Sequence, residues 1–287
     1  ASLTSDPLGS RSVAIGRSAL AIQNFTTATD TYNVAVGYNA GGQITTGVQN
    51  TIVGGLAADA MTSGQNNVMI GFAAAGAGNV TGSSNIMIGA AAGGVLSSGS
   101  NNVAIGEDAA SGLEGGSNNL LLGHDAGRTG SPGGNIVNSS NEVVLGDENI
   151  TAIYAAVSSI STSDERDKTD FTALALGLDF VKALEPVTYY WDKRSKYGDK
   201  YADDYDLTAQ TPDGTHKEDW MDVGFKAQAV VALEEAAGYK ISDKTNLVSN
   251  LTDDGTQYGL KYDRFVPILV KAIQELSAEV EKLKSGG

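Results

Sequence analysis

Cysteine is absent from this chain of 287 residues. Its absence excludes disulfides, thiol chemistry and zinc sites built on cysteine. Long apolar runs are also missing: no stretch approaches the roughly 20 residues that a membrane-spanning helix needs, so we expect no membrane insertion. The N-terminal residues show no charged region followed by an apolar one. The sequence therefore predicts no signal peptide and is compatible with a start inside a longer protein.

Basic residues are scarce and unevenly placed. The chain has 19 Lys and Arg against 34 Asp and Glu, a net charge of -15, which argues against binding to nucleic acid or to an anionic membrane. Residues 1–162 contain no Lys and no Trp, and they hold 27 of the 36 glycines. Every Lys and both Trp lie in residues 163–287. Such a shift in composition predicts two separately built domains.

The glycine-rich part repeats a short apolar run that ends in glycine. Most of the closing glycines are 17 residues apart, and an alanine follows three residues after most of them. The glycines are Gly16, Gly37, Gly54, Gly71, Gly89, Gly106, Gly123 and Gly146. This period is too short for helical repeats and predicts a β-solenoid or β-roll with two short strands per coil. In it the glycines make corners, and Val and Ile stack as an internal ladder from coil to coil.

Turns rich in Gly, Ser and Asn separate the runs. Their repeated Asn-Asn pairs either coordinate ions or sugars or, as we prefer, satisfy backbone groups in their own turn. The regular apolar runs argue against a disordered tract. By this pattern, residues 12–146 resemble the repeats of phage tail-fibre and bacterial surface proteins, and are similar to the β-roll head of trimeric autotransporter adhesins. The resemblance implies a homotrimeric β-structured fibre.

Residues 147–162 leave the repeat. Ile150, Ile153 and Val157 either form a last strand or cap a trimer axis. The polar run 158–162 lies at the boundary, where a cleavable bond is expected. The chain is thus divided into a fibre of about eight repeats (1–150), a junction (151–162) and a second domain (163–287).

The second domain is predicted to be mixed α/β. Apolar residues at helical spacing indicate helices over 171–184 and 227–237, the second closed by Gly238. Alternating residues indicate strands over 187–191, 221–225 and 258–262. The charged stretch 192–219 is predicted to be a long loop or a hairpin insertion.

A helix over 263–284 ends the chain, with Pro267 in its first turn. Its apolar residues follow heptad spacing: Val266, Leu269, Ile273, Leu276, Val280 and Leu283. This seam either packs on its own domain or forms a coiled coil between chains, and the spacing alone does not decide. Because β-branched residues at a with Leu at d favour dimers, a trimer has to be imposed by the rest of the chain.

Four ordered motifs carry a second resemblance. They are Ser163-Asp164-x-Arg166-x-Lys168, Leu184-Glu185-Pro186-Val187-x-x-Tyr190-Trp191, Val223-Gly224-Phe225-x-Ala227-Gln228 and Tyr262-x-x-Phe265-Val266-Pro267-x-Leu269-x-Lys271-Ala272-Ile273-Gln274-Glu275-Leu276. In this order they resemble the C-terminal intramolecular chaperone of phage tail spikes and fibres, the endosialidase-type self-cleaving serine peptidases. The resemblance implies that three copies trimerise, template the folding of the upstream fibre and then cut the Thr162–Ser163 bond.

The residue types agree with a Ser163–Lys168 dyad. A serine hydroxyl is a weak nucleophile that needs a base, and His124 and His216 lie in loops with no motif around them. A lysine is a base only when burial favours its neutral amine, so cleavage would depend on folding or assembly. Arg166 would disfavour a second positive charge nearby. Asp164 either positions the dyad or caps the segment that follows.

These expectations define a phage tail fibre in the virion that autoproteolysis frees from its chaperone, which acts in the host cytoplasm during assembly. Its expected partners are its own copies, a host cell-surface glycan or protein receptor, and other tail proteins on the N-terminal side. We expect no cofactor and no metal. The alternative is a bacterial trimeric surface adhesin that keeps an uncleaved chaperone. A glycan-degrading tailspike is disfavoured because the ten acids of residues 1–162 do not recur in register.

Overall fold

A computed structural model describes residues 3, 6, 8–153, 163–200, 202 and 204–286. The chain divides into two compact units, Ala1–Thr151 with Tyr197–Gln210, and Ala152–Lys196 with Thr211–Gly287. The first break lies beside the change in composition. The grouping of Tyr197–Gln210 with the repeat unit was not expected, because these residues belong to the predicted loop 192–219.

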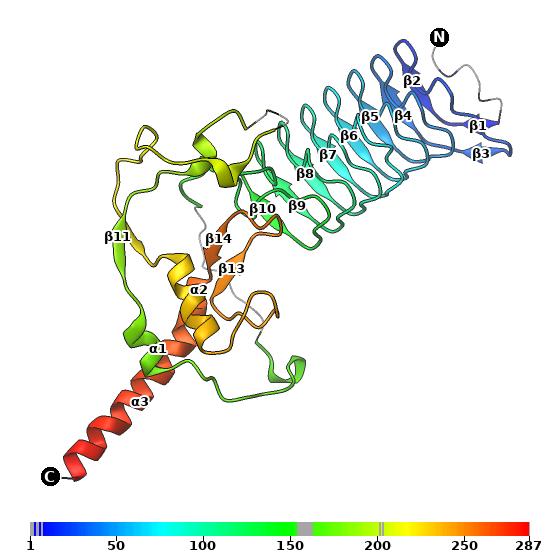
Figure 1. Cartoon of the computed structure of the whole chain (residues 1–287). Coiled ribbons are helices and arrows are strands. Elements are labelled where there is room, and N and C mark those ends of the chain that lie inside the picture. The colour runs from blue at the N-terminus through cyan, green and yellow to red at the C-terminus, as the bar shows by residue number, and fades with distance from the viewer. Residues whose placement is uncertain are drawn as a thin grey trace. The chain divides into compact units, whose positions relative to one another are not determined.

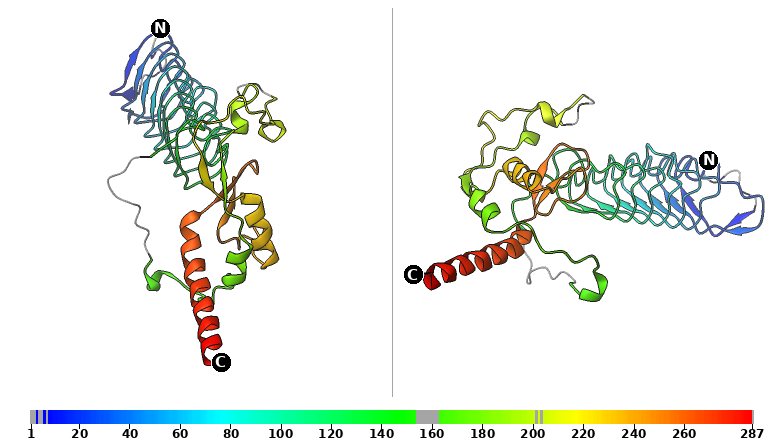
Figure 2. Two further views of the ribbon diagram at one scale, coloured as in Figure 1. Left: turned by 90° about the vertical axis from the view of Figure 1, so that its left-hand side faces the viewer. Right: turned by 60° about the horizontal axis from the view of Figure 1, so that its bottom comes forward.

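The repeat unit is a β-solenoid of about seven turns whose coils stack along one axis (Figures 1 and 2). Eight parallel strands form one sheet in the order β10-β9-β8-β7-β6-β5-β4-β2. They are β2 (Val13–Ile15), β4 (Val34–Val36), β5 (Thr51–Val53), β6 (Val68–Ile70), β7 (Ile86–Ile88), β8 (Val103–Ile105), β9 (Leu120–Leu122) and β10 (Val143–Leu145). Two further short strands, β1 (Gly9–Ser10) and β3 (Thr29–Asp30), pair with each other. Each coil from β4 on thus has one strand and several turns, so the prediction of two strands per coil was wrong.

The inside of the solenoid is lined by the middle residue of each strand. Ile52, Met69 and Leu121 are fully buried there. The first and third residues of the strands point outward and are partly or fully exposed, so most Val and Ile of the repeat do not form the predicted internal ladder. Apart from Thr51, the outward residues are all Val, Ile or Leu. Because side chains alternate across a strand, this leaves an apolar outer face along the sheet.

A column of buried asparagines runs beside the strands. Its members are Asn33, Asn50, Asn67, Asn85, Asn102 and Asn119. The Asn85 Nδ2 donates to Asn67 Oδ1 at 3.1 Å and to the Gly99 carbonyl at 2.9 Å. Its own Oδ1 accepts the backbone N–H and the Nδ2 of Asn102, each at 3.1 Å. The amides therefore tie each coil to the next, whereas the sequence had favoured bonds within a single turn.

The first Asn of each pair has a different role. Asn66, Asn101 and Asn118 have φ of 57°, 59° and 60°, the left-handed region that Asn tolerates better than most residues. The closing glycine is required as well: Gly54 has a φ of 141°, and a Cβ there would clash with the Gly71 carbonyl of the next coil. The alanines three residues after these glycines, such as Ala57 and Ala109, are fully buried.

The second unit contains short helices and two-stranded sheets. Its elements are α1 (Leu178–Ala183), β11 (Val187–Tyr189), β12 (Asp222–Gly224), α2 (Ala227–Ala236), β13 (Ser249–Leu251), β14 (Tyr258–Leu260) and α3 (Phe265–Ser285). Strand β11 pairs with β12 and β13 with β14, both antiparallel. The core consists of Leu176, Phe180, Val230, Val248, Phe265 and Ile268.

Three points of the sequence prediction downstream of the repeat need correction. The helix predicted over 171–184 begins only at Leu178, after Gly177, and residues 171–177 are not helical. Ile150 and Ile153 lie outside any strand and are exposed, and Val157 lies outside the described residues. Strand β13 was missed because its Ser-Asn-Leu sequence carries no strand signal.

The last helix is present within two residues of its predicted start, with Pro267 in its first turn. Phe265, Ile268 and Ala272 pack into its own unit, whereas the whole predicted seam is exposed. The exposed fraction is 43% for Leu269, 66% for Ile273 and 79% for Leu283. The seam is therefore not used in packing within one chain. Among the described residues, no helix combines the length and apolar character that crossing a bilayer requires.

Candidate functional site

Ser163 and Lys168 meet on either side of a single turn. The 3-10 turn η1 (Glu165–Asp167) separates them, and the Lys168 backbone N–H closes it on the Glu165 carbonyl at 3.1 Å. This folds the chain back so that the Lys168 Nζ lies 2.6 Å from the Ser163 Oγ and 3.1 Å from the Ser163 carbonyl oxygen. The pair that the sequence singled out is thus within hydrogen-bond distance in one chain. Thr162, the other residue of the predicted cut, lies outside the described residues.

Asp164 and Arg166 bind each other rather than the Ser163–Lys168 pair. The Asp164 Oδ1 accepts the Arg166 backbone N–H at 2.9 Å, which caps the turn, and the guanidinium Nε donates to the same oxygen at 3.0 Å. The Arg166 side chain lowers the pKa of Asp164, and Asp164 raises the pKa of Arg166. Of the two roles predicted for Asp164, the geometry supports capping. The ion pair also offsets the positive charge of Arg166 close to Lys168.

Ser163 and Lys168 are both exposed in the single chain. General-base catalysis by a lysine needs the neutral amine, which the removal of surrounding water favours. The geometry for proton transfer is therefore present, and the missing requirement is removal of water from around the amine.

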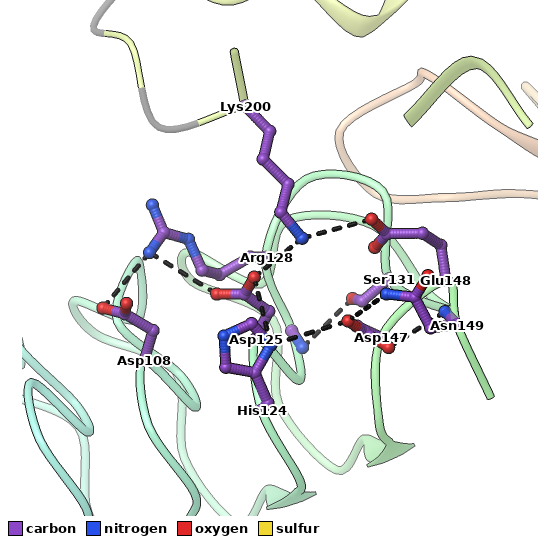
Figure 3. Close-up of polar contacts among 10 residues, drawn as sticks. Asp108, His124, Asp125, Arg128, Ser131, Asp147, Glu148, Asn149 and Lys200 are labelled. Carbon is purple, nitrogen blue, oxygen red and sulfur yellow. Dashed lines mark hydrogen bonds and ion pairs between the residues drawn. The ribbon is translucent and has the colours of Figure 1, made fainter. Parts of the chain in front are cut away.

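A second polar cluster lies on the last coils of the solenoid (Figure 3). The Lys200 Nζ lies 2.8 Å from Asp125 Oδ2 and 3.1 Å from Glu148 Oε1. All three side chains are mostly buried, with exposed fractions of 17%, 2% and 6%. Burial lowers the pKa of Lys200, but its bonds to the two carboxylates raise it more, and the net shift is upward.

His124 and Asp147 extend this cluster. The His124 Nδ1 lies 3.5 Å from a carboxylate oxygen of Asp125 and of Asp147. Burial raises the pKa of Asp147, but hydrogen bonds from Asn149 and His124 and the charge of Lys200 lower it by more, so the net shift is downward. The donor atoms of His124, Asp125 and Asp147 lie within 4.8 Å of one another, a set that suits a divalent cation chemically. The positive charge beside Asp125 is already supplied by Lys200.

Sequence reasoning missed this cluster, although the repeat contained its signal. Asp108, Asp125 and Glu148 each stand two residues after a closing glycine, so they fall in one column of the solenoid. The statement that the acids do not recur in register was therefore wrong for the last coils. The side chain of Arg128 reaches this column, with its Nη1 at 3.2 Å from Asp108 Oδ1.

Comparison with known proteins concerns the downstream part of the chain. Residues 163–239 match the model of a peptidase family, S74, that is described as chaperone of endosialidase. The matched residues begin at Ser163 and include three of the four motifs; the motif from Tyr262 to Leu276 lies beyond them. No curated protein and no solved structure matches the chain. Downstream of a β-solenoid, residues 163–239 are thus similar to the family described as chaperone of endosialidase, which is named as a peptidase, and this similarity supports a chaperone-type function for a tail fibre or tailspike.

Proposed function

We propose that this chain is a phage tail fibre whose downstream part, residues 163–287, trimerises, chaperones the folding of the solenoid and frees itself by cutting the Thr162–Ser163 bond. One observation carries the catalytic part of the proposal. The Lys168 Nζ lies 2.6 Å from the Ser163 Oγ, at the start of the segment that matches the chaperone family.

The covalent structure of the chain suggests a route for the cleavage. Ser163 supplies the nitrogen of the cut bond, so attack of its Oγ on the Thr162 carbonyl carbon closes a five-membered ring. The neutral Lys168 amine takes the hydroxyl proton and then gives it to the nitrogen as the C–N bond breaks. The resulting ester joins Thr162 to the Ser163 Oγ. Water hydrolyses it to a Thr162 carboxylate and an N-terminal serine.

Two exposed apolar surfaces support assembly into trimers. The first is the outer face of the solenoid sheet, which at about 4.8 Å per strand extends over roughly 34 Å. The second is the seam of α3, where Ile273 and Leu283 are more than half exposed. Apolar surfaces of this extent are costly in water, and each of them would be buried by contact with the same surface of neighbouring copies. Because the heptad residues alone favour dimers, a preference for three copies would have to come from the rest of the chain.

Assembly also supplies the missing condition for cleavage. When neighbouring chains exclude water from around Lys168, its neutral amine becomes accessible and Ser163 is activated. Cleavage would then follow correct assembly and break the covalent link between the fibre and the chaperone that built it. In this proposal the fibre resides in the virion and binds a host surface glycan or protein, and its N-terminal side joins other tail proteins. The alternative, a bacterial surface adhesin with a retained chaperone, differs in leaving the chain uncut.

The test is the mass of purified chains on denaturing gels. The proposal expects two fragments of 162 and 125 residues, with Ser163 as the new N-terminus. Ser163→Ala and Lys168→Met should each give only the intact chain of 29.5 kDa while trimers still form. Lys182→Met, which changes an exposed lysine of the same unit, is the matched control and should be cut normally. Cleavage in the Ser163→Ala chain would refute the dyad, and an intact native chain would favour the adhesin.

A further inference from the structure

In the last coils of the solenoid, acidic side chains lie in equivalent positions of neighbouring coils. Asp108, Asp125 and Glu148 occupy the same place in successive coils, and Asp125 and Glu148 are almost fully buried. Like charges in one column repel, and a buried carboxylate is costly unless a cation compensates it. Burial and the neighbouring carboxylates Asp125 and Glu107 raise the pKa of Asp108 in spite of Arg128. The stability of these last coils therefore depends on cationic side chains that lie beside the carboxylates.

One of these cations comes from beyond the predicted cut. Arg128 belongs to the solenoid itself, but Lys200 lies 37 residues downstream of Ser163 in the sequence. Its ammonium lies between Asp125 and Glu148, at 2.8 and 3.1 Å, as Figure 3 shows. The segment Tyr197–Gln210, which carries Lys200, is compact with the solenoid and not with the unit that contains the rest of residues 163–287. Cutting the chain before Ser163 would leave this contact in place.

We infer that the ion pairs of Lys200 with Asp125 and Glu148, which we call the clasp, hold the downstream part of the chain on the end of the fibre after the Thr162–Ser163 bond has been cut. The inference rests on the proposed cleavage for its biological role, but the contact exists in the uncut chain. Withdrawal of Lys200 leaves two buried carboxylates without their shared cation. Release of the chaperone is therefore a separate event that follows cleavage and requires the ion pairs of Lys200 with Asp125 and Glu148 to break.

The first experiment tests the clasp without any cleavage. In the Ser163→Ala full-length chain, hydrogen exchange of peptides from 197–210 is compared with and without Lys200→Met. Loss of one partner of a buried ion pair should raise exchange in this segment by about tenfold or more. Lys240→Met, an exposed lysine in the other unit, should leave it unchanged. Glu148→Gln should raise exchange too, and adding it to Lys200→Met should raise exchange by less than the two single effects combined. Equal exchange in the Lys200→Met and control chains would overturn the inference.

The second experiment uses the chain that is able to cut itself. After cleavage, size-exclusion chromatography under native conditions is followed by a denaturing gel. The two fragments should elute together for the native chain and for Lys240→Met, and apart for Lys200→Met. If no fragments form in any of the three, the proposed cleavage fails while the exchange experiment still decides on the clasp. If fragments form and elute together in all three, the clasp is refuted and the proposed cleavage stands.

Discussion

The asparagine column allows a strict test of the fold, because one chemical change can be made at two neighbouring places. In Asn85→Asp, the buried amide loses both hydrogen bonds that it donates, to Asn67 Oδ1 and to the Gly99 carbonyl. Each lost bond costs about 1 kcal/mol. The new carboxylate also faces two acceptors without water, which adds several kcal/mol. We expect a loss of about 4–6 kcal/mol in the free energy of unfolding of the solenoid.

Asn101→Asp is the matched control. Asn101 is exposed and has a φ of 59°, a conformation that Asp tolerates about as well as Asn. The free energy of unfolding of the Asn101→Asp chain should differ from that of the native chain by less than about 0.5 kcal/mol. Both variants are to be followed by circular dichroism during thermal unfolding, at equal protein concentration, because assembly makes the midpoint depend on concentration.

Repeating the unfolding experiment at lower pH tests why Asn85→Asp loses stability. A buried, unpaired carboxylate has a raised pKa, so lowering the pH should protonate the carboxylate that Asn85→Asp introduces and recover part of the lost stability. The reasoning is refuted if the two variants unfold at the same temperature at neutral pH. It is refuted equally if the deficit of Asn85→Asp does not shrink as the pH falls to about 4.

Two further predictions concern assembly and pH. Ile273→Asp places a charge on the exposed seam and should abolish trimers, whereas the neighbouring Gln274→Asp should not; light scattering distinguishes them, and trimers in both variants would exclude the seam as an interface. Because the pKa of Asp147 is lowered in the folded chain, its charge stabilises the fold at pH values above the ordinary pKa of 3.8, and this contribution is lost in stronger acid. Because the pKa of Lys200 is raised, its charge stabilises the fold at pH values below the ordinary pKa of 10.5, and this contribution is lost in stronger base. Hydrogen exchange in 197–210 should therefore increase, beyond its intrinsic pH dependence, only outside this range; an increase near neutral pH would contradict the assignment.

The solenoid could be predicted from the sequence because its cause is local and repeated. A glycine whose Cβ would clash with the next coil recurs, in most coils, every 17 or 18 residues, and an alanine follows most of these glycines three residues later. Which residues face inward could not be predicted in the same way. In a run such as Val103-Ala104-Ile105, side-chain alternation allows either face to be the core, and only the closed coil shows that Ala104 is buried.

The candidate site divides in the same manner. Ser163 and Lys168 could be paired from the sequence because their motif resembles that of a known family, and in the structure a single turn joins them. The cluster of Asp125, Glu148 and Lys200 joins residues 52 and 75 positions apart, and Lys200 stands in a loop without any periodic pattern. The place of the acids was readable from the repeat register, but nothing in the sequence indicated which cation meets them.

The stacking of equivalent coils has a consequence for how such a fibre varies. Each coil bonds to the next through the same backbone and asparagine contacts, so one unit of 17 residues can be removed or duplicated without a change in the bonds on either side. The sheet then shortens or lengthens by one strand spacing, about 4.8 Å. The length of the solenoid therefore changes by whole repeats. Mutation can add or remove one repeat at a time while the residues at both ends stay the same.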